Sequence, residues 1–504
     1  MNATRQVLLG SVMLTFFSIF AGGIAYLTKI VLVRNLTVEE YGLFFSVLTL
    51  VLFLQLFISL GLPTGLARTI AKFRVHEELG RVKSIIVGSF VIQMSMALLV
   101  MVVLFFLSYF LAQRYFENPQ ARWVLLALLL YFPLNVLRSQ MSALFNGFSK
   151  SLYLSLIQFL YNLGIFLIVV LGFYVFLYDG IEVPIVGYLG AFFLVFLVLG
   201  VVLFKTFNVF RVRSEEFKRS NTELIIFSAP LLFTAIGGVF LSYFDTLMLT
   251  FYKGLVEVGV YNIVYPTALL LVLIGSSIGL ALLPVITRLF EEGKKDLLKS
   301  AFSKIYVFVG FIVIPAIVML VLLSEFIILI FFGEEYLLGF VVFNILAIGS
   351  LFKVFFAIQN QALIGIGKST SIFWVFIIGA VSNVVLNILL IPQYSLTGAG
   401  IATIVSFALM FGISFMMLRR EIEIHFPIFK IIALVVCSLS IVLSVEVFWM
   451  LDFNRYVLTA LGLGVGGVLY VALVIVFRII TLQDVLNLVG VDGMNLLKKI
   501  KLNR

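Results

Sequence analysis

Charged residues are scarce in this sequence. Asp, Glu, Lys and Arg make up 12% of its 504 residues, whereas hydrophobic residues make up 63%. A soluble domain carries about 25% charged residues, so no water-soluble fold could bury this much apolar surface. The apolar runs are continuous for about 20 residues or more, unlike the short alternating strands of a membrane barrel. The composition therefore predicts an all-α integral membrane protein.

Cysteine and histidine are almost absent. The single cysteine, Cys437, and the two histidines, His76 and His425, match no metal-ligand spacing and exclude a disulfide. No phosphate-binding loop, catalytic triad or HExxH motif occurs, and the glycine-rich run Gly462–Gly467 lies inside an apolar stretch, where close helix packing explains it. We therefore expect no catalytic residues, no metal site, no cofactor and no enzyme activity.

Fourteen long apolar stretches predict fourteen transmembrane helices. The predicted spans are 7–33, 41–69, 84–112, 122–147, 152–178, 184–205, 223–252, 256–287, 301–332, 336–366, 370–392, 396–418, 427–450 and 456–479.

The first six stretches are echoed by the next six at an offset of roughly 217 residues. Glu40–Phe44 matches Glu257–Tyr261, the Ala143-Leu144 pair matches Ala362-Leu363, and Gly187–Ala191 matches Gly398–Ala402. Each half has six helices, so the two form parallel repeats of the kind found in two-lobed transporters, with a helix pair added. The predicted domains are an N-lobe at 1–212, a C-lobe at 213–420, helices 13 and 14 at 421–480, and a cytoplasmic amphipathic tail at 481–504, for which a solvated tail is the alternative.

Positive charge sets the predicted orientation. Lys and Arg concentrate in the loops and tail that lie inside if the N-terminus is cytoplasmic. We therefore expect both termini in the cytoplasm and a multi-pass protein of the cell membrane. The net charge of +10 follows from this asymmetry, and a nucleic-acid partner is not expected.

A polar stripe marks the fourth predicted helix. Asn135, Arg138, Ser139, Ser142 and Asn146 recur at helical spacing and share one face. Gln158 and Asn162 form a shorter stripe on the fifth helix. Ionisable residues inside a membrane face a cavity or a partner, so Arg138, with Asn135, Ser139 and Asn162, is a candidate for binding an anionic, hydrogen-bonding solute.

Two further cations extend this hypothesis. Lys353, in the tenth predicted helix, lies near the position equivalent to Arg138, and Arg68 ends the second helix. Cationic walls suit a phosphate-linked sugar. Alternatively, each cation pins neighbouring helices together, and Arg68 snorkels to the cytoplasmic surface.

Lys29 and Asp245 lie at nearly equivalent places in the first and seventh predicted helices. They could form an ion pair that closes an outer gate, or Asp245 could bind a coupling ion. A purely structural charge is the third interpretation.

The sequence resembles a known transporter family. Leu32–Gly42 followed by Leu60–Leu62 resembles the polysaccharide transporter family, the Wzx-like lipid-linked oligosaccharide flippases, as do Ala229-Pro230 and Phe244–Met248. That family belongs to the multidrug/oligosaccharidyl-lipid/polysaccharide (MOP) exporter superfamily. The resemblance implies a MATE-like two-lobed fold and translocation of a polyprenyl-(pyro)phosphate-linked oligosaccharide from the cytoplasmic to the outer leaflet, by alternating access, for surface glycan assembly. It also implies that cavity cations hold the headgroup, for which Arg138, Arg68 and Lys353 are the matching positions.

Three rival functions remain at this point. Cation-coupled multidrug exporters of the same superfamily resemble one another in having an acidic residue in the first helix, whereas this sequence has Lys29 there and no carboxylate. A non-transporting scaffold of a glycan-assembly complex has no need of polar stripes, and a membrane enzyme would need a larger loop than the roughly 17 residues available. The expected partners are the lipid-linked glycan, membrane lipids and a glycan polymerase or glycosyltransferase, with the chain as a monomer.

Overall fold

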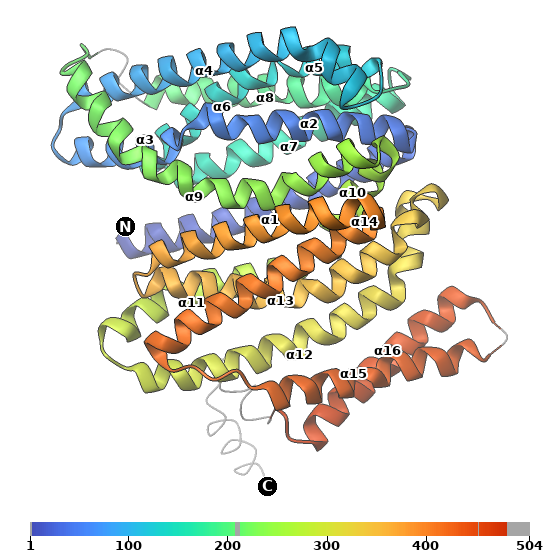
Figure 1. Ribbon diagram of the computed structural model, residues 1–504. Coiled ribbons are helices and arrows are strands. Elements are labelled where there is room, and N and C mark those ends of the chain that lie inside the picture. Colours follow the sequence, from blue (N-terminus) through green and yellow to red (C-terminus); the bar gives the residue numbers. More distant parts are fainter. Residues whose placement is uncertain (1–2, 207–211, 452, 481–504) are drawn as a thin grey trace. The chain divides into compact units, whose positions relative to one another are not determined.

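A computed structural model describes residues 3–206, 212–451 and 453–480, and these described residues contain helices and no strands. Figure 1 shows long helices connected by short loops. The elements are α1 (Ala3–Asn35), α2 (Val38–Ser59), α3 (Leu62–Val75), α4 (Leu79–Arg114), α5 (Gln120–Leu128), α6 (Tyr131–Gly147), α7 (Ser151–Tyr174), α8 (Glu182–Thr206), α9 (Phe217–Tyr252), α10 (Leu255–Ala268), α11 (Val272–Glu291), α12 (Lys295–Ile327), the π-helix η2 (Ile328–Phe332), the 3₁₀-helix η3 (Glu334–Gly339), α13 (Phe340–Gly365), α14 (Ser369–Ile422), α15 (Ile428–Trp449) and α16 (Arg455–Val476). The all-α membrane fold is confirmed.

Twelve helical segments of the described residues are long and apolar enough to cross a membrane. One of them, α14, runs for 54 residues through a non-helical Ser395, which lies in the predicted gap between spans 370–392 and 396–418. In addition, the 33-residue α1 covers the first predicted span. If α14 is counted as two spans and α1 is added, the twelve segments become the predicted fourteen. That all fourteen cross the membrane remains a prediction.

The second predicted helix is broken in both halves of the chain. α2 begins with a capping box, in which the Thr37 hydroxyl accepts from the Glu40 N–H and the Glu40 carboxylate accepts from the Thr37 N–H. It ends at Ser59, and Leu60 and Gly61, both with positive φ, separate it from α3, which begins at Leu62. The equivalent span is likewise divided into α10 and α11.

The helix junctions of the repeat also match. α6 ends at Gly147 and Lys150 precedes α7. In the same way, α13 ends at Gly365 and Lys368 precedes α14. α6 packs on α3, and α13 packs on α11, so each half repeats the same helix pairing. The predicted duplication is therefore visible in the local structure.

The chain forms two compact units. The first comprises the chain up to Val264 with Ile328–Gly339 and Gly379–Ala402, and the second comprises Tyr265–Ile327, Phe340–Ile378 and the chain from Thr403 onward. These units follow packing, whereas the predicted lobes 1–212 and 213–420 follow the sequence repeat. The lobe boundaries therefore remain a prediction.

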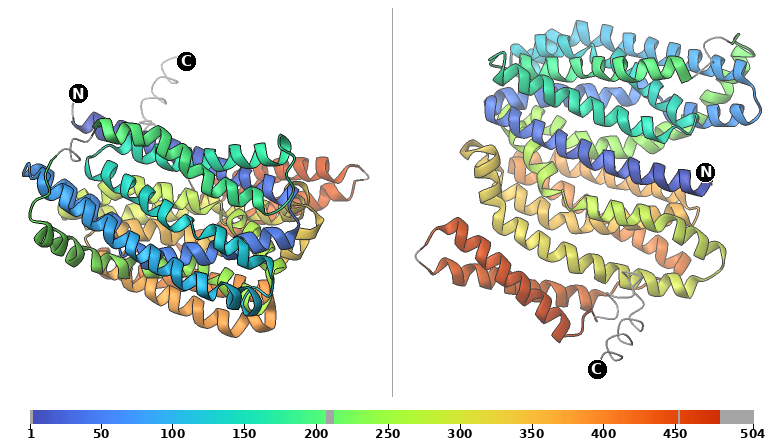
Figure 2. Two further views of the ribbon diagram at one scale, coloured as in Figure 1. Left: turned by 90° about the horizontal axis from the view of Figure 1, so that it is seen from above. Right: turned by 180° about the vertical axis from the view of Figure 1, so that it is seen from behind.

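In the second unit, α15 and α16 form an antiparallel pair, visible in Figure 1 and Figure 2, and α15 packs on α12. Gly462 and Gly466 of α16 allow this close approach, because a Cβ at either position would lie within 2.7 Å of the α15 backbone. The glycine-rich run is thus a packing surface, as expected. The predicted amphipathic tail at 481–504 lies outside the described residues.

Candidate functional site

Arg138 lies on α6 in the first unit and is held by neutral amides. Its Nε and Nη2 donate to Asn135 Oδ1 at 3.1 and 2.8 Å, and its Nη1 donates to Gln158 Oε1 of α7 at 3.3 Å. The i, i+3 spacing of Asn135 and Arg138 places both on one face of α6. Asn135 is 8% exposed, so this arrangement lies inside the helix bundle of the unit.

The Arg138 guanidinium makes cation–π contacts with two aromatic rings. Its guanidinium carbon lies 4.7 Å from the ring centre of Tyr161 and 5.9 Å from that of Phe192. No carboxylate of the described residues forms an ion pair with it. A guanidinium has five N–H donors, and the three hydrogen bonds above leave two of them. One N–H on Nη1 and one on Nη2 therefore remain for a further acceptor.

Asn162 extends the polar surface along α7. It accepts from Gln158 Nε2 at 3.3 Å and donates to the Ala21 carbonyl of α1 at 2.8 Å. The structure thus brings Asn135, Arg138 and Asn162 together, linked through Gln158. Since every partner is a neutral amide or carbonyl, the network orients the guanidinium without neutralising it.

Ser139 belongs to a neighbouring network that the sequence did not reveal. Its hydroxyl donates to the Val136 carbonyl at 2.8 Å and contacts Gln93 Oε1 of α4 at 3.4 Å. Gln93 and Gln140 both donate to Ser89 Oγ, at 3.0 and 2.9 Å. Gln140 lies off the predicted stripe because it faces α4. The i, i+4 spacing of Ser89 and Gln93 was the available signal.

Lys353 lies on α13 in the second unit. Its Nζ lies 4.4 Å from the ring centre of Phe407 and 5.7 Å from that of Tyr265, whose hydroxyl it approaches at 3.4 Å. Like Arg138, it is a partly buried cation lined by aromatic faces. The predicted pairing of the two cations across a cavity stays a prediction, since they belong to different units.

Arg68 lies at the exposed side of α3, with its guanidinium stacked 3.9 Å from the centre of the Phe227 ring of α9. It lines a groove of about 590 Å³ together with Lys72 and Glu223. Lys72 donates to Glu223 at 3.1 Å and holds the pKa of that carboxyl below its usual value of 4.5, with Arg81 at 2.9 Å contributing. Arg68 thus lies beside an ion-pair network, toward the predicted cytoplasmic end of its helix.

Lys29 and Asp245 contact consecutive residues of α10. Lys29 Nζ donates to the Asn262 carbonyl at 2.9 Å and lies 5.0 Å from the centre of the Phe45 ring. Asp245 accepts from the Tyr261 hydroxyl at 2.7 Å. Their contacts therefore meet at α10, and the predicted gate and ion-coupling roles remain predictions.

Asp245 is a buried carboxylate in a small polar cluster. It is 4% exposed and also accepts from Asn387 Nδ2 at 2.6 Å, while Asn387 Nδ2 contacts Asn383 Oδ1 at 3.1 Å. Asn387 Oδ1 and Asn383 Nδ2 are buried without a hydrogen-bond partner in the described part of the chain. Residues 3–206, 212–451 and 453–480 contain no cluster of three or more His, Cys, Asp or Glu suited to a metal.

Residues 7–290 match the family model described as polysaccharide biosynthesis protein, which covers more than half of the chain. The chain belongs to the polysaccharide biosynthesis protein family. Residues 230–389 also match the MatE family model. The predicted family and its place in the MOP superfamily are confirmed.

Relatives of this polysaccharide biosynthesis family member include transporters. An uncharacterised membrane protein of Methanocaldococcus jannaschii is 28% identical over 82% of this chain and 84% of its own length. The lipid II flippase MurJ of Bacillus subtilis is 27% identical over 51% of each chain. A probable low-salt glycan biosynthesis flippase of Haloferax volcanii is 24% identical over 39% of this chain and 42% of its own.

Solved structures share the fold. A lipid II flippase MurJ in an inward closed conformation superposes with a TM-score of 0.74, at 15% identity, over 92% of this chain and 98% of the other. An inward-facing multidrug resistance MATE family transporter superposes with a TM-score of 0.68, at 15% identity, over 79% of this chain and 94% of the other. The predicted MATE-like fold is confirmed.

Proposed function

We propose that this protein is a flippase that moves a polyprenyl-(pyro)phosphate-linked oligosaccharide from the cytoplasmic to the outer leaflet by alternating access. The observation that carries the proposal is the Arg138 guanidinium, which has no carboxylate partner in the described part of the chain and two N–H groups left. Relatives named as flippases support the transport class. The protein would reside in the cell membrane with both termini cytoplasmic.

The proposed headgroup interaction is a charge-assisted one. The phosphate would accept from the two remaining N–H groups of Arg138, with Asn135 orienting the guanidinium directly, Asn162 doing so through Gln158, and Tyr161 facing the attached sugar. Arg68 would attract the anion near the cytoplasmic surface, and Lys353 would contact it in the second unit, whereas the Ser139 hydroxyl is already engaged with the Val136 carbonyl. The polyprenyl chain would remain in the bilayer through a lateral opening.

The proposed energy source is an ion gradient acting at Asp245. Its buried carboxylate, to which the Asn387 amide nitrogen donates, would provide the oxygen ligands. Lys29 would act in a gate, because its ammonium binds the backbone of the same helix that Asp245 contacts.

A cation-coupled multidrug exporter is the second candidate, favoured by the MatE match over residues 230–389. The described α1 contains Lys29 and no Asp or Glu, which disfavours the coupling arrangement expected of that class. We propose no enzyme activity. A polymerase or glycosyltransferase would receive the flipped glycan, and the chain would act as a monomer.

The cargo hypothesis is tested by Arg138→Gln combined with Lys353→Gln. In proteoliposomes that contain lipid-linked oligosaccharide, we expect the double variant to lose at least tenfold in flipping rate, because the headgroup loses its two cations. Ser142→Ala is the matched control, since this hydroxyl only donates to the Arg138 carbonyl at 3.0 Å. Wild-type flipping by a folded double variant would contradict the assignment, and selective export of cationic drugs by the wild type would support the rival.

The coupling hypothesis is tested by Asp245→Asn. We expect the variant to flip at a rate independent of imposed sodium, proton or potential gradients, whereas the wild type responds to one of them. A variant with intact gradient dependence would remove Asp245 as the coupling site.

A further inference from the structure

The groove between α3 and α9 joins charged and apolar side chains. Both helices belong to the first unit and pack on one another, as Figure 1 shows. The charges come from Arg68, Lys72 and Glu223, and the apolar surface from Ile226, Phe227 and Leu231. Arg68 and Lys72 are four residues apart on α3, as are Glu223 and Phe227 on α9, so each pair shares one face of its helix. The predicted orientation places this groove at the cytoplasmic side.

The two cations of the groove differ in their partners. Arg68 stacks on the Phe227 ring and makes no hydrogen bond or ion pair within residues 3–206, 212–451 and 453–480. The N–H groups of its guanidinium therefore remain for an acceptor. Lys72, in contrast, donates to Glu223 at 3.1 Å. An anion that enters the groove can bind Arg68 at once, but it reaches Lys72 only by replacing the Glu223 carboxylate.

Glu223 connects α9 to two neighbouring helices. Its carboxylate accepts from Lys72 of α3 and, at 2.9 Å, from Arg81 of α4. In the described part of the chain, the Lys72 contact is the one ion pair between α3 and α9. Arg81 also donates to the Ser220 hydroxyl at 3.1 Å and lies 3.5 Å from the Glu216 carboxylate. If Glu223 is displaced, α9 therefore keeps charged contacts with α4 and loses its ion pair with α3.

A phosphate has the chemistry to replace this carboxylate. The Lys72 and Glu223 side chains are 61% and 34% exposed, and ion pairs open to water are weak. A phosphate group carries up to about two negative charges and three acceptor oxygens, against one charge and two oxygens for a carboxylate. Ile226 is 69% exposed beside these charges and offers apolar surface to a prenyl chain. The groove thus suits an anionic lipid headgroup better than a small hydrophilic anion.

The opposite end of α9 is held by neutral groups. Thr250 and Ser46 of α2, 3% and 0% exposed, share a hydrogen bond of 2.7 Å between their hydroxyls. The Tyr115 hydroxyl, which follows α4, donates to the Leu247 carbonyl at 2.8 Å. An anion has no ion pair to replace at these contacts. Displacement of Glu223 would therefore free only the end of α9 that begins at Phe217.

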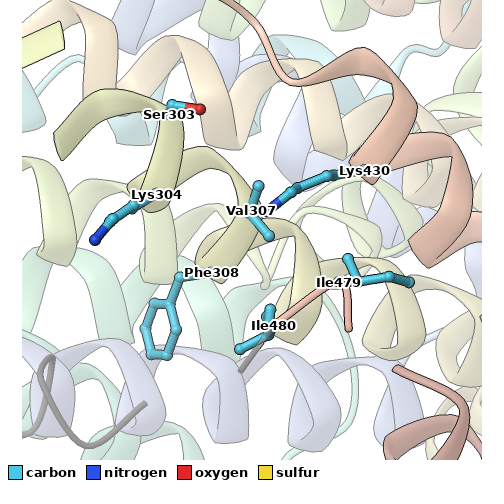
Figure 3. A pocket seen from close by; sticks show the side chains of 7 residues that line it. All are labelled: Ser303, Lys304, Val307, Phe308, Lys430, Ile479 and Ile480. Atoms are coloured by element: carbon cyan, nitrogen blue, oxygen red, sulfur yellow. The ribbon is translucent and has the colours of Figure 1, made fainter. Parts of the chain in front are cut away.

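A smaller pocket in the second unit offers no comparable site. It lies between α12 and α15 and has a volume of about 90 Å³. Figure 3 shows that the Lys304 ammonium points away from this pocket, whereas Lys430 extends toward Val307. The two ammonium groups do not converge on one anion, unlike the cations of the α3–α9 groove.

We propose that the phosphate of the lipid-linked cargo displaces Glu223 from Lys72, binds between Lys72 and Arg68, and releases the start of α9 from α3. This inference rests on the proposed function, since the displacing anion is the cargo headgroup. Arg81 keeps α9 attached to α4 during the exchange. Glu223 is therefore a positioning residue that couples the arrival of the headgroup to a movement of α9.

The test measures the spacing of α3 and α9 in the full-length protein in detergent. Spin labels on cysteines introduced at Ala71 and Thr222, which are both exposed, report this spacing by electron paramagnetic resonance. The probe is farnesyl pyrophosphate, a short polyprenyl pyrophosphate. We expect it to add a population with a longer spacing. Farnesol, sodium pyrophosphate and phosphatidylglycerol at the same concentration should leave the spacing unchanged.

Two substitutions should change the binding of the probe in opposite directions. Glu223→Gln removes the competing anion, so it should tighten farnesyl pyrophosphate binding about tenfold and lengthen the spacing without the probe. Lys72→Gln also breaks the ion pair, but it should weaken binding about tenfold because the phosphate loses a donor. Calorimetry measures both. Glu292→Gln, which breaks ion pairs with Arg288 and Lys294 elsewhere, is the matched control and should match the wild type.

Weaker binding by Glu223→Gln would overturn the proposal, because general damage to the groove weakens binding in both variants. An unchanged spacing with saturating farnesyl pyrophosphate would also overturn it. Equal lengthening by sodium pyrophosphate would replace the lipid-linked anion with a free one, and equal lengthening by phosphatidylglycerol would replace it with bulk lipid. Arg138→Gln with Lys353→Gln should retain the response to the probe. Lost flipping with this response intact therefore tests the transport site alone, and wild-type flipping without the response refutes only the displacement of Glu223.

Discussion

Gly42 and Gly259 occupy equivalent positions in the sequence repeat, and the structure places them in contact. A Cβ on Gly42 would overlap the Leu255 carbonyl and lie 3.0 Å from the Gly259 nitrogen, and a Cβ on Gly259 would lie 2.5 Å from the Val38 carbonyl. The start of α2 therefore packs on the start of α10 by reciprocal contacts, as in self-complementary interfaces. Glycine is required here by backbone proximity.

Gly42→Ala should destabilise the protein by about 1–3 kcal/mol, because the methyl group overpacks a backbone crossing. The unfolding temperature in detergent measures the effect. Gly22→Ala is the matched control, since a Cβ there meets nothing within 4 Å. An unchanged unfolding temperature for Gly42→Ala would contradict the close crossing.

Glu223 makes the stability of the α3–α9 region dependent on pH. Its lowered folded-state pKa, caused first by the Lys72 hydrogen bond, means that its stabilisation is present above its ordinary pKa of 4.5 and is lost as the pH falls through the folded value. We expect the unfolding temperature of the wild type to fall as the pH drops below 4.5, and Glu223→Gln to flatten this dependence. Glu77→Gln, at an exposed residue without an ion pair in the described ranges, should keep the wild-type slope.

At the scale of elements, Ser395 divides α14 into two helices. Its φ of 49° and ψ of −129° lie in a region that glycine adopts at little cost, and Pro392 precedes it. Next to this turn, a Cβ on Gly398 would lie 2.5 Å from the Leu390 carbonyl, so the two helical arms approach closely. The kink separates the eleventh and twelfth predicted spans.

Ser395→Gly should therefore raise the free energy of unfolding by about 1–2 kcal/mol, because glycine removes the backbone strain. Ser395→Val should lower it. Chemical denaturation in mixed micelles would measure both changes. Ser371→Gly, inside a regular helical turn of α14, is the control. An equal rise in the free energy of unfolding for Ser371→Gly would refute the role of the Ser395 backbone angle.

The elements of the transport site were largely predictable, whereas their contacts were not. Asn135 and Arg138 share a face of α6 because helical spacing is a local property. Ser139, three residues from Val136 and four from Asn135, turns instead toward Gln93 of α4. That choice depends on which helix packs beside α6, and neither spacing nor composition contains it.

At the scale of the whole molecule, the orientation in the membrane remains a prediction based on positive charge. Cysteines placed at Asp179 and Glu335, both exposed, should react with an impermeant maleimide added to intact cells, and a cysteine at Lys294 should react only after permeabilisation. Cys437 is 3% exposed and gives little background. Labelling of a cysteine at position 294 in intact cells would contradict the predicted topology.

The two compact units also differ from the two lobes expected from the repeat. α9 packs on α2, α3 and α4, so the seventh predicted helix lies with the first six in this structure. A duplication determines which helices resemble one another. It does not determine which of them touch in one conformation of a transporter with two lobes.

The sequence by itself determined the membrane class, the duplication, the approximate positions of the helices and the shortage of acidic residues in the first six helices, because hydropathy and helical spacing are local properties. The tertiary structure alone decided which polar groups meet: Arg138 with Gln158, Lys29 with the Asn262 carbonyl, and Asp245 with Asn387. The last two contacts join residues more than 100 positions apart. Such pairs form only when helices pack, and the low dielectric of the interior then strengthens each buried hydrogen bond.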